Sequence, residues 1–174
     1  MKFNKLPKHS ILVIAIITTW IKTYITYQSS FDMEIDNSMQ QFILLINPLA
    51  FLLFIYGISL FFKTAKRRNR YLITTSVILS ILVYGNVVFY RFFNDFITLP
   101  VLFQTSNFGD LGSSAAAIIN WFDFLYFADV ILLFAFMKFM PVLKEQFTVR
   151  KDVRRAYFVM AVAMLFLNCS DDDE

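Results

Sequence analysis

The residues best suited to bind another molecule gather in one stretch, Tyr84 to Ser114, where polar side chains interrupt a row of aromatic ones. Polar groups at the edge of a hydrocarbon layer are costly unless they face protein, water or a lipid headgroup. A guanidinium beside amide and hydroxyl groups suits the phosphate or glycerol of such a headgroup. The stretch therefore predicts a lipid-headgroup site made of Arg91, Asn94, Asp95, Thr98 and Gln104.

A packing role explains the same stretch without any ligand. Its aromatic and aliphatic residues would embed it in the outer leaflet as an interfacial or re-entrant amphipathic segment. Thr98 can cap a short helix there, with Pro100 in the first turn. Arg91 would then hold helices together by pairing with Asp95, Asp123 or Asp129. Composition alone slightly favours this packing role over a headgroup site.

Three further polar residues fall inside apolar runs: Asn86, Asp123 and Asp129. A carboxylate in a membrane span faces the bundle interior by default, where it meets a partner or water. Asp123 lies near the predicted outer interface, where water can reach it. Asp129 lies deeper, with Arg91, Tyr84 and Asn86 as possible partners. A polar pin between helices and a functional role explain Asp129 equally well.

The chain contains no Gly-rich phosphate loop, CxxC pair, HExxH or GxSxG, which are motifs of common catalytic centres. His9 stands alone near the N-terminus and fits a membrane interface better than a metal site. Cys169, the single cysteine, fits an inert thiol better than a nucleophile. We therefore expect no catalytic residue, no metal ligand and no cofactor within this chain.

Composition indicates a membrane protein. Of the 174 residues, 58% are hydrophobic and 18% aromatic, including 22 phenylalanines. Soluble domains average about 45–50% apolar residues. The net charge of +3 comes from basic residues gathered in a few loops, a pattern that fits membrane topology and anionic lipid rather than nucleic acid. The sequence predicts an all-α integral membrane protein without a nucleic-acid partner.

Five apolar runs predict five transmembrane helices in one membrane domain, residues 1–168. Asn47 and Pro48 lie inside the second run, so we expect that helix to start or kink there. Lys22 lies near the end of the first run, where its ammonium can extend to the headgroups. The fifth run is short for a span, and residues 169–174 form an acidic tail. The predicted spans cover residues 10–27, 42–62, 71–92, 120–143 and 154–168.

Basic residues gather on one side of these spans: before the first, between the second and third, and between the fourth and fifth. Only Lys22 and Arg91 fall on the other side. The positive-inside rule therefore predicts a multi-pass protein of the plasma membrane, with the N-terminus cytoplasmic and the C-terminus extracellular. Arg91 has no topological role in this arrangement, which strengthens its interpretation as a headgroup ligand.

A resemblance to the lipoteichoic acid synthases of Gram-positive bacteria rests on the run NVVFYRFFNDFITLPVLFQTSNFGDLGSS, followed by WFDFLYFADV. Two earlier runs are similar to the same family, KTYITYQSSF and ILLINPL, so the resemblance covers residues 22–168. It implies five membrane helices followed by a large extracellular sulfatase-like domain. In the family, that domain transfers glycerol phosphate from phosphatidylglycerol to a polymer growing on a glycolipid anchor, using a threonine nucleophile and a manganese ion.

The resemblance ends at residues 169–174, where the family continues into a linker and its catalytic domain. No residue here matches the family's nucleophile or metal ligands, so we expect this truncated chain to be inactive by itself. The resemblance implies a membrane-anchoring, lipid-binding domain whose ligand is phosphatidylglycerol or the glycolipid anchor, with envelope-synthesis proteins as possible partners. The alternative is a non-catalytic membrane scaffold for those proteins. A small transporter fits less well, because paired repeats are absent.

Overall fold

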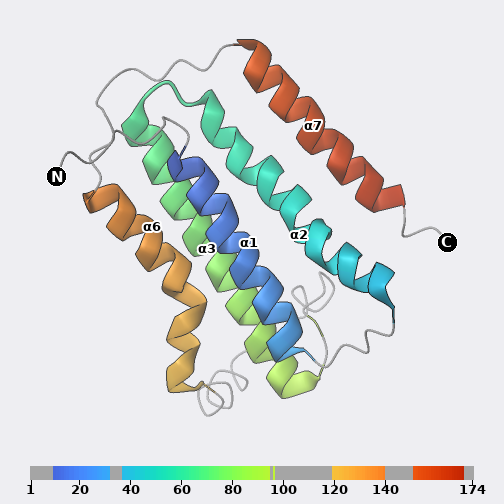
Figure 1. The fold of residues 1–174 in the computed structure, drawn as a ribbon. Helices are drawn as coiled ribbons and strands as arrows, with labels where there is room; N and C mark the ends of the chain where they lie inside the picture. The colour runs from blue at the N-terminus through green and yellow to red at the C-terminus, as the bar shows by residue number, and fades with distance from the viewer. Residues whose placement is uncertain (1–9, 32–36, 95, 97–118, 140–150, 171–174) are drawn as a thin grey trace, which may run out of the picture.

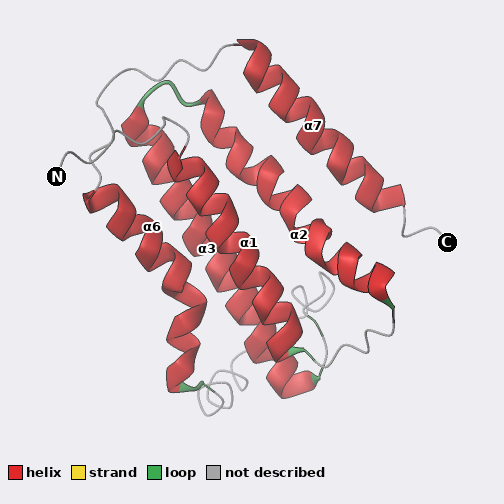
Figure 2. Cartoon of the chain, in the orientation of Figure 1, coloured by secondary structure: helices red, strands yellow, loops and turns green. Residues whose placement is uncertain are grey.

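The computed structural model describes residues 10–31, 37–94, 96, 119–139 and 151–170. Every regular element within these ranges is helical (Figure 2), which confirms the all-α prediction for this part of the chain. Two short 3-10 helices, η1 (Ile58–Phe61) and η3 (Trp121–Phe127), continue α2 and precede α6. The α-helices are α1 (Ser10–Ser30), α2 (Ser38–Gly57), α3 (Ala65–Phe93), α6 (Ala128–Phe139) and α7 (Lys151–Ser170).

The helices form a bundle in which each runs opposite to the one before it (Figure 1). α1 contacts α2, α3 and α6, whereas α7 packs on α2 at the edge of the bundle (Figure 1). α1 and α3 end where α2 and η3 begin, and we call this the Arg91 end. The opposite, basic end carries the residues around the start of α3: Lys63, Lys66, Arg67, Arg68 and Arg70.

Three described helices are long and apolar enough to cross a membrane: Ser10–Ser30, Ser38–Phe61 and Ala65–Arg91. Membrane localisation follows from these spans. The predictions of five spans and of the orientation of the two termini stay predictions. The interfacial or re-entrant segment between the third and fourth predicted spans lies outside the described residues, as does the acidic tail from residue 171 onward.

α1 has an apolar outward face and a partly polar inward face, unlike a helix of a water-soluble bundle. Its outward face carries apolar side chains spaced four residues apart, all of them exposed: Val13, Ile17, Ile21 and Ile25. Its inward face includes three buried threonines, Thr19, Thr23 and Thr26. An apolar exterior costs nothing in lipid, where polar side chains instead hold neighbouring helices together by hydrogen bonds. The helix therefore presents its hydrogen-bonding groups to the bundle.

Two helix boundaries differ from the sequence prediction. α2 begins at Ser38, where the side chain of Asn37 accepts a hydrogen bond from the backbone N–H of Met39. Pro48 lies within α2, which excludes a helix start at Asn47–Pro48, while the alternative of a kink there stays a prediction. Packing and neighbouring polar groups let membrane helices tolerate an internal proline. α3 begins at Ala65, so part of the basic cluster belongs to the first turns of this helix.

The core lies where α1 meets α2, α3 and α6. Leu133 of α6 and Tyr56 of α2 are both fully buried in it. Its other buried members are Ile11, Leu12, Ala15, Ile16, Leu52, Leu60, Leu72 and Leu79. The packing of these residues fixes how far along the bundle the buried threonines of α1 meet the polar residues of α3 and α6.

Candidate functional site

The Arg91 end is organised around Asp123, which is only 5% exposed in the first turn of η3. Arg91, in the last turn of α3, donates from Nη1 to Oδ2 and from Nη2 to Oδ1 of Asp123, both at 2.9 Å. The hydroxyl of Tyr84 donates to the same carboxylate at 3.1 Å. A two-pronged pair of this kind fixes the direction of the guanidinium as well as its distance. It also ties the end of α3 to the start of η3.

The local structure at the start of η3 explains the position of the Asp123 carboxylate. Asn120 precedes η3 in an extended conformation and forms a capping box with Asp123. The backbone N–H of Asn120 donates to Oδ2 of Asp123 at 2.9 Å. The reciprocal bonds satisfy backbone donors that the start of a helix leaves without partners. The sequence interpretation of Asp123 as a solvated interfacial residue is therefore wrong, because the carboxylate is buried and bonded.

The five predicted headgroup residues divide into two groups. Asp95, Thr98 and Gln104 lie outside the described residues. Arg91 has a side chain that is 27% exposed and is paired with Asp123. Asn94 ends α3 in the left-handed conformation, with φ 55°, and its N–H donates to the carbonyl of Tyr90 at 2.8 Å. Asparagine tolerates this conformation better than most residues, so Asn94 has a structural function as a helix cap.

A second carboxylate, Asp129 in the first turn of α6, lies deeper in the bundle and is 4% exposed. Nζ of Lys22 donates to its Oδ2 at 2.7 Å, and the Lys22 side chain is 9% exposed. The hydroxyls of Thr19 and Ser80 donate to the same carboxylate at 3.2 and 3.3 Å. Lys22 also donates to Oγ of Ser80 at 2.5 Å. We call Lys22, Asp129, Thr19 and Ser80 the deep ion-pair cluster.

The direction of the Lys22 side chain differs from the sequence prediction. It was expected to extend toward the headgroups, yet its ammonium points into the bundle and binds Asp129. The sequence predicts Arg91, Tyr84 or Asn86 as the partner of Asp129. In the part of the chain that the structure describes, the hydrogen bonds to Asp129 come instead from Thr19, Lys22 and Ser80. A signal was present in the sequence, because Thr19, Thr23 and Thr26 mark one face of α1 at helical spacing, and Lys22 lies on that face.

The deep ion-pair cluster continues toward α2 through hydroxyl groups. The hydroxyl of Tyr56 lies 2.9 Å from Oγ1 of Thr19 and 2.7 Å from Oγ of Ser76. Tyr56 and Ser76 are almost completely buried. Four helices, α1, α2, α3 and α6, therefore meet through one connected set of polar side chains. Buried polar networks of this kind specify a single helix register when every member has a partner.

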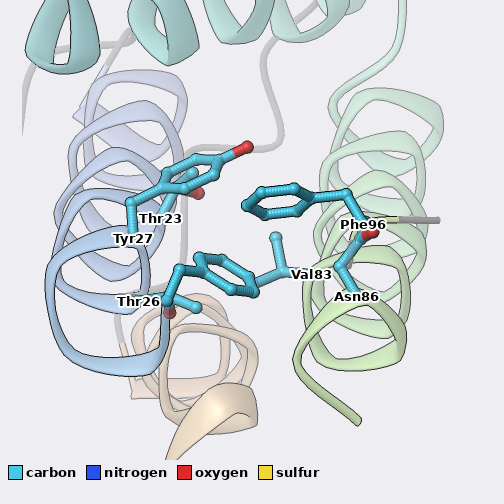
Figure 3. Close-up of a pocket in the computed structure, with 7 residues that line it drawn as sticks. Thr23, Thr26, Tyr27, Val83, Asn86 and Phe96 are labelled. Carbon is cyan, nitrogen blue, oxygen red and sulfur yellow. The ribbon is translucent and has the colours of Figure 1, made fainter. Parts of the chain in front are cut away.

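A cavity of about 560 Å³ lies between α1, α2 and α3. A neighbouring cavity of about 410 Å³ shares Thr23, Tyr27, Val83 and Asn86 with it. Figure 3 shows the smaller one, with side chains of α1 facing Val83 and Asn86 of α3 and the ring of Phe96 beside them. We call the two cavities together the three-helix groove. Of the predicted polar residues, Asn86 lines this groove, and its Nδ2 donates to the carbonyl of Leu82 at 3.2 Å.

Among the described residues, no cluster of three His, Cys, Asp or Glu side chains could hold a metal ion. Both buried carboxylates are engaged by cations and hydroxyl groups. The arrangement therefore offers three features: a fixed, partly exposed guanidinium at one end, a deep ion pair, and a groove between three helices.

The chain is similar over most of its length to proteins of one family. The sequence profile of the family described as lipoteichoic acid synthase N-terminal domain matches residues 1–172. Lipoteichoic acid synthase 2 of Bacillus subtilis (strain 168) is 39% identical over 90% of this chain and 24% of its own length. Lipoteichoic acid synthase-like YvgJ of the same strain is 38% identical over 79% of this chain and 22% of its own length. Lipoteichoic acid synthase of Staphylococcus aureus (strain USA300) is 30% identical over 95% of this chain and 25% of its own length.

The chain thus spans about a quarter of the length of these relatives. No solved structure matches it.

Proposed function

The chain belongs to the family of lipoteichoic acid synthase N-terminal domains, and from this membership we propose that it is the membrane domain of a phosphoglycerol transferase that builds a cell-envelope polymer. Its apolar spans support an anchoring role. The reaction itself is proposed for the larger proteins of the family, since this chain covers only about a quarter of their length.

Within that role, the Arg91 end holds the headgroup of an anionic lipid, with phosphatidylglycerol as the expected ligand. The observation that carries this proposal is the guanidinium of Arg91, which is partly exposed and fixed in direction by Asp123. A guanidinium has five N–H donors, and the two bonds to Asp123 use two of them. The remaining donors suit phosphate oxygens, which guanidinium binds in a fork geometry that lysine cannot reproduce. Asn94, Asp95, Thr98 and Gln104 shape the rest of the site.

Lipid retention by Arg91 variants tests this site. Purified protein is mixed with defined lipids, and bound lipid is measured by native mass spectrometry beside a melting curve. Arg91→Lys should lower phosphatidylglycerol retention while the melting temperature changes little, and Arg91→Ala should lower it further. Ile81→Ala is the matched control, because Ile81 lies on an exposed apolar face of the same helix. Unchanged lipid retention in a stable Arg91→Ala protein would remove the headgroup site.

The proposed orientation puts the Arg91 end outside the cell and the basic end in the cytoplasm. A cysteine placed between Lys63 and Arg70 should be shielded from an impermeant thiol reagent in intact cells. A cysteine near Asn107 should be labelled. Cys169 is replaced first to remove background labelling. The reverse pattern would overturn the orientation.

A further inference from the structure

We propose that η3 changes between two helical forms, and that the pair of Arg91 and Asp123 holds it in the 3-10 form. An anion bound to Arg91 releases Asp123 and lets residues 121–127 continue α6 as an α-helix. The inference deepens the proposed headgroup site and rests on it, because the anion that Arg91 takes there is the signal that changes η3.

The length of η3 is unusual for a 3-10 helix. It has seven residues, Trp121–Phe127, whereas 3-10 runs longer than about four residues are uncommon, because their hydrogen bonds have poorer geometry than those of an α-helix. Ala128 follows with α-helical backbone angles, φ −60° and ψ −36°, so η3 joins α6 without a break. Contacts of its side chains must therefore stabilise the 3-10 form.

Polar side chains spaced three residues apart make these contacts. Asp123 pairs with Arg91 of α3. The hydroxyl of Tyr126 lies 2.8 Å from Oγ of Ser30, at the end of α1. A 3-10 helix has three residues per turn, so side chains at this spacing share one face, and here that face meets the bundle. The other side chains of η3 include four that are strongly exposed: Trp121, Phe122, Phe124 and Leu125.

The same residues also fit the bundle in an α-helical register. In α6, Asp129 and Leu133 lie four residues apart and are both buried. An α-helix that continues back from Asp129, at about 100° per residue, places Phe122 about 20° and Leu125 about 40° from this buried face. Asp123 is then turned about 120° away from it. The α-helical register therefore exchanges a buried carboxylate for two apolar side chains that the 3-10 form leaves exposed.

The pair with Arg91 decides between the two registers. Asp123 stays buried because the guanidinium, the hydroxyl of Tyr84 and the N–H of Asn120 all donate to its carboxylate. A phosphate on the remaining donors of Arg91 places a second negative charge beside this carboxylate, and the two anions repel each other. The repulsion favours the register in which Asp123 has turned away. By reciprocity, that register opens every donor of Arg91 and strengthens anion binding.

The exposure of two nearby rings distinguishes the registers. The full chain is made with 4-trifluoromethylphenylalanine at position 122 or at position 124, and ¹⁹F NMR with dissolved oxygen measures the exposure of each ring. In the 3-10 form Phe122 is 77% and Phe124 is 67% exposed. In the α-helical form only the ring at 122 turns inward, because position 124 lies about 140° from the buried face. Position 124 is therefore the internal control.

Micelles of dodecyl maltoside, which contain no phosphate, are compared with the same micelles after phosphatidylglycerol is added. Phosphatidylglycerol should shield the ring at 122 and leave the ring at 124 unchanged. Asp123→Leu should shield the ring at 122 without the lipid, because no carboxylate remains to pair with Arg91. Asp152→Leu is the matched control, since it removes an exposed carboxylate from the first turn of α7 and should change neither ring.

The outcomes keep this inference separate from the headgroup site. If phosphatidylglycerol is retained but the ring at 122 stays exposed, the headgroup site holds and the change of register is wrong. If phosphatidylglycerol is not retained but Asp123→Leu shields that ring, the headgroup site is wrong and the two registers of η3 are supported.

Should Asp123→Leu not fold, Asp123→Asn decides, because it removes the charge, keeps the shape and should shield the ring at 122 to a smaller extent. Full exposure of that ring in every folded Asp123 variant would overturn the inference.

Discussion

Asp123 and Asp129 lie six residues apart and are almost equally buried, yet their surroundings differ. Asp129 binds the ammonium of Lys22 inside the bundle and accepts bonds from two hydroxyl groups on neighbouring helices. Asp123 binds the guanidinium of Arg91 at one end, where the cation is 27% exposed against 9% for Lys22. The burial of the cation therefore distinguishes the Asp129 pair inside the bundle from the Asp123 pair, whose cation is partly exposed.

The energetics follow from that difference in burial. Removing one partner of a buried ion pair leaves a charge that neither water nor protein offsets, at a cost of about 3–5 kcal/mol. A partly exposed cation is rehydrated when its partner is removed, and exposed pairs contribute only about 0–1 kcal/mol. We therefore expect a larger loss of stability when the buried Asp129 is left without its cation than when the partly exposed Arg91 is left without its anion.

The largest effect is expected for Lys22→Met, which keeps the length of the side chain and removes its charge. Asp129 would stay buried without a cation, and the free energy of unfolding should fall by about 3–5 kcal/mol. Thermal unfolding in detergent measures this change. The double variant Lys22→Met with Asp129→Leu should recover most of the stability, because both charges are gone. A single variant as stable as the unmodified protein would disprove the deep pair.

A smaller loss is expected for Asp123→Asn, which keeps the shape of the side chain and removes its charge. Arg91 can turn toward water or lipid, so the free energy of unfolding should fall by about 1–2 kcal/mol. The same melting curves measure it. A loss as large as that of Lys22→Met would mean that both pairs serve packing alone.

The smallest effects come from matched hydroxyl deletions at the two carboxylates. Ser80→Ala removes a buried hydroxyl that bonds Lys22 and Asp129, and should cost about 1 kcal/mol. Tyr84→Phe removes the hydroxyl at Asp123, where the geometry is more open, and should cost about 0.5 kcal/mol. Chemical denaturation resolves the order of the two variants. The opposite order would contradict the assignment of Asp129 as the deeper site.

The helices themselves were predictable, because long apolar runs leave few alternatives in a membrane. The start of α2 was not, since Asn37 supplies a cap ahead of the apolar run and Pro48 is accommodated inside the helix. The candidate site was predictable in part. Arg91 and Asp123 were identified as polar residues of interest, but they lie 32 residues apart, and spacing could not select between the possible carboxylate partners.

Lys22 shows why the remainder of the site was missed. A hydropathy pattern shows which segments of the chain are apolar. It contains no information about which face of a helix contacts which neighbouring helix. Lys22 and Asp129 are 107 residues apart, so only the packing of α1 against α6 brings them together. The threonines of α1 mark the face that contacts the bundle. Because that face is partly polar, it favours an inward direction for the ammonium of Lys22.

The most direct test compares phosphatidylglycerol retained per folded molecule in Lys22→Met and Arg91→Ala, by native mass spectrometry below the melting temperature of each. We expect Lys22→Met to be strongly destabilised while its folded fraction retains lipid normally. We expect Arg91→Ala, in which the buried Asp123 keeps its bonds from Tyr84 and Asn120, to lose lipid in its folded fraction. If retention falls in both variants only in proportion to stability, Arg91 serves helix packing like Lys22, and the distinction between the two ion pairs is wrong.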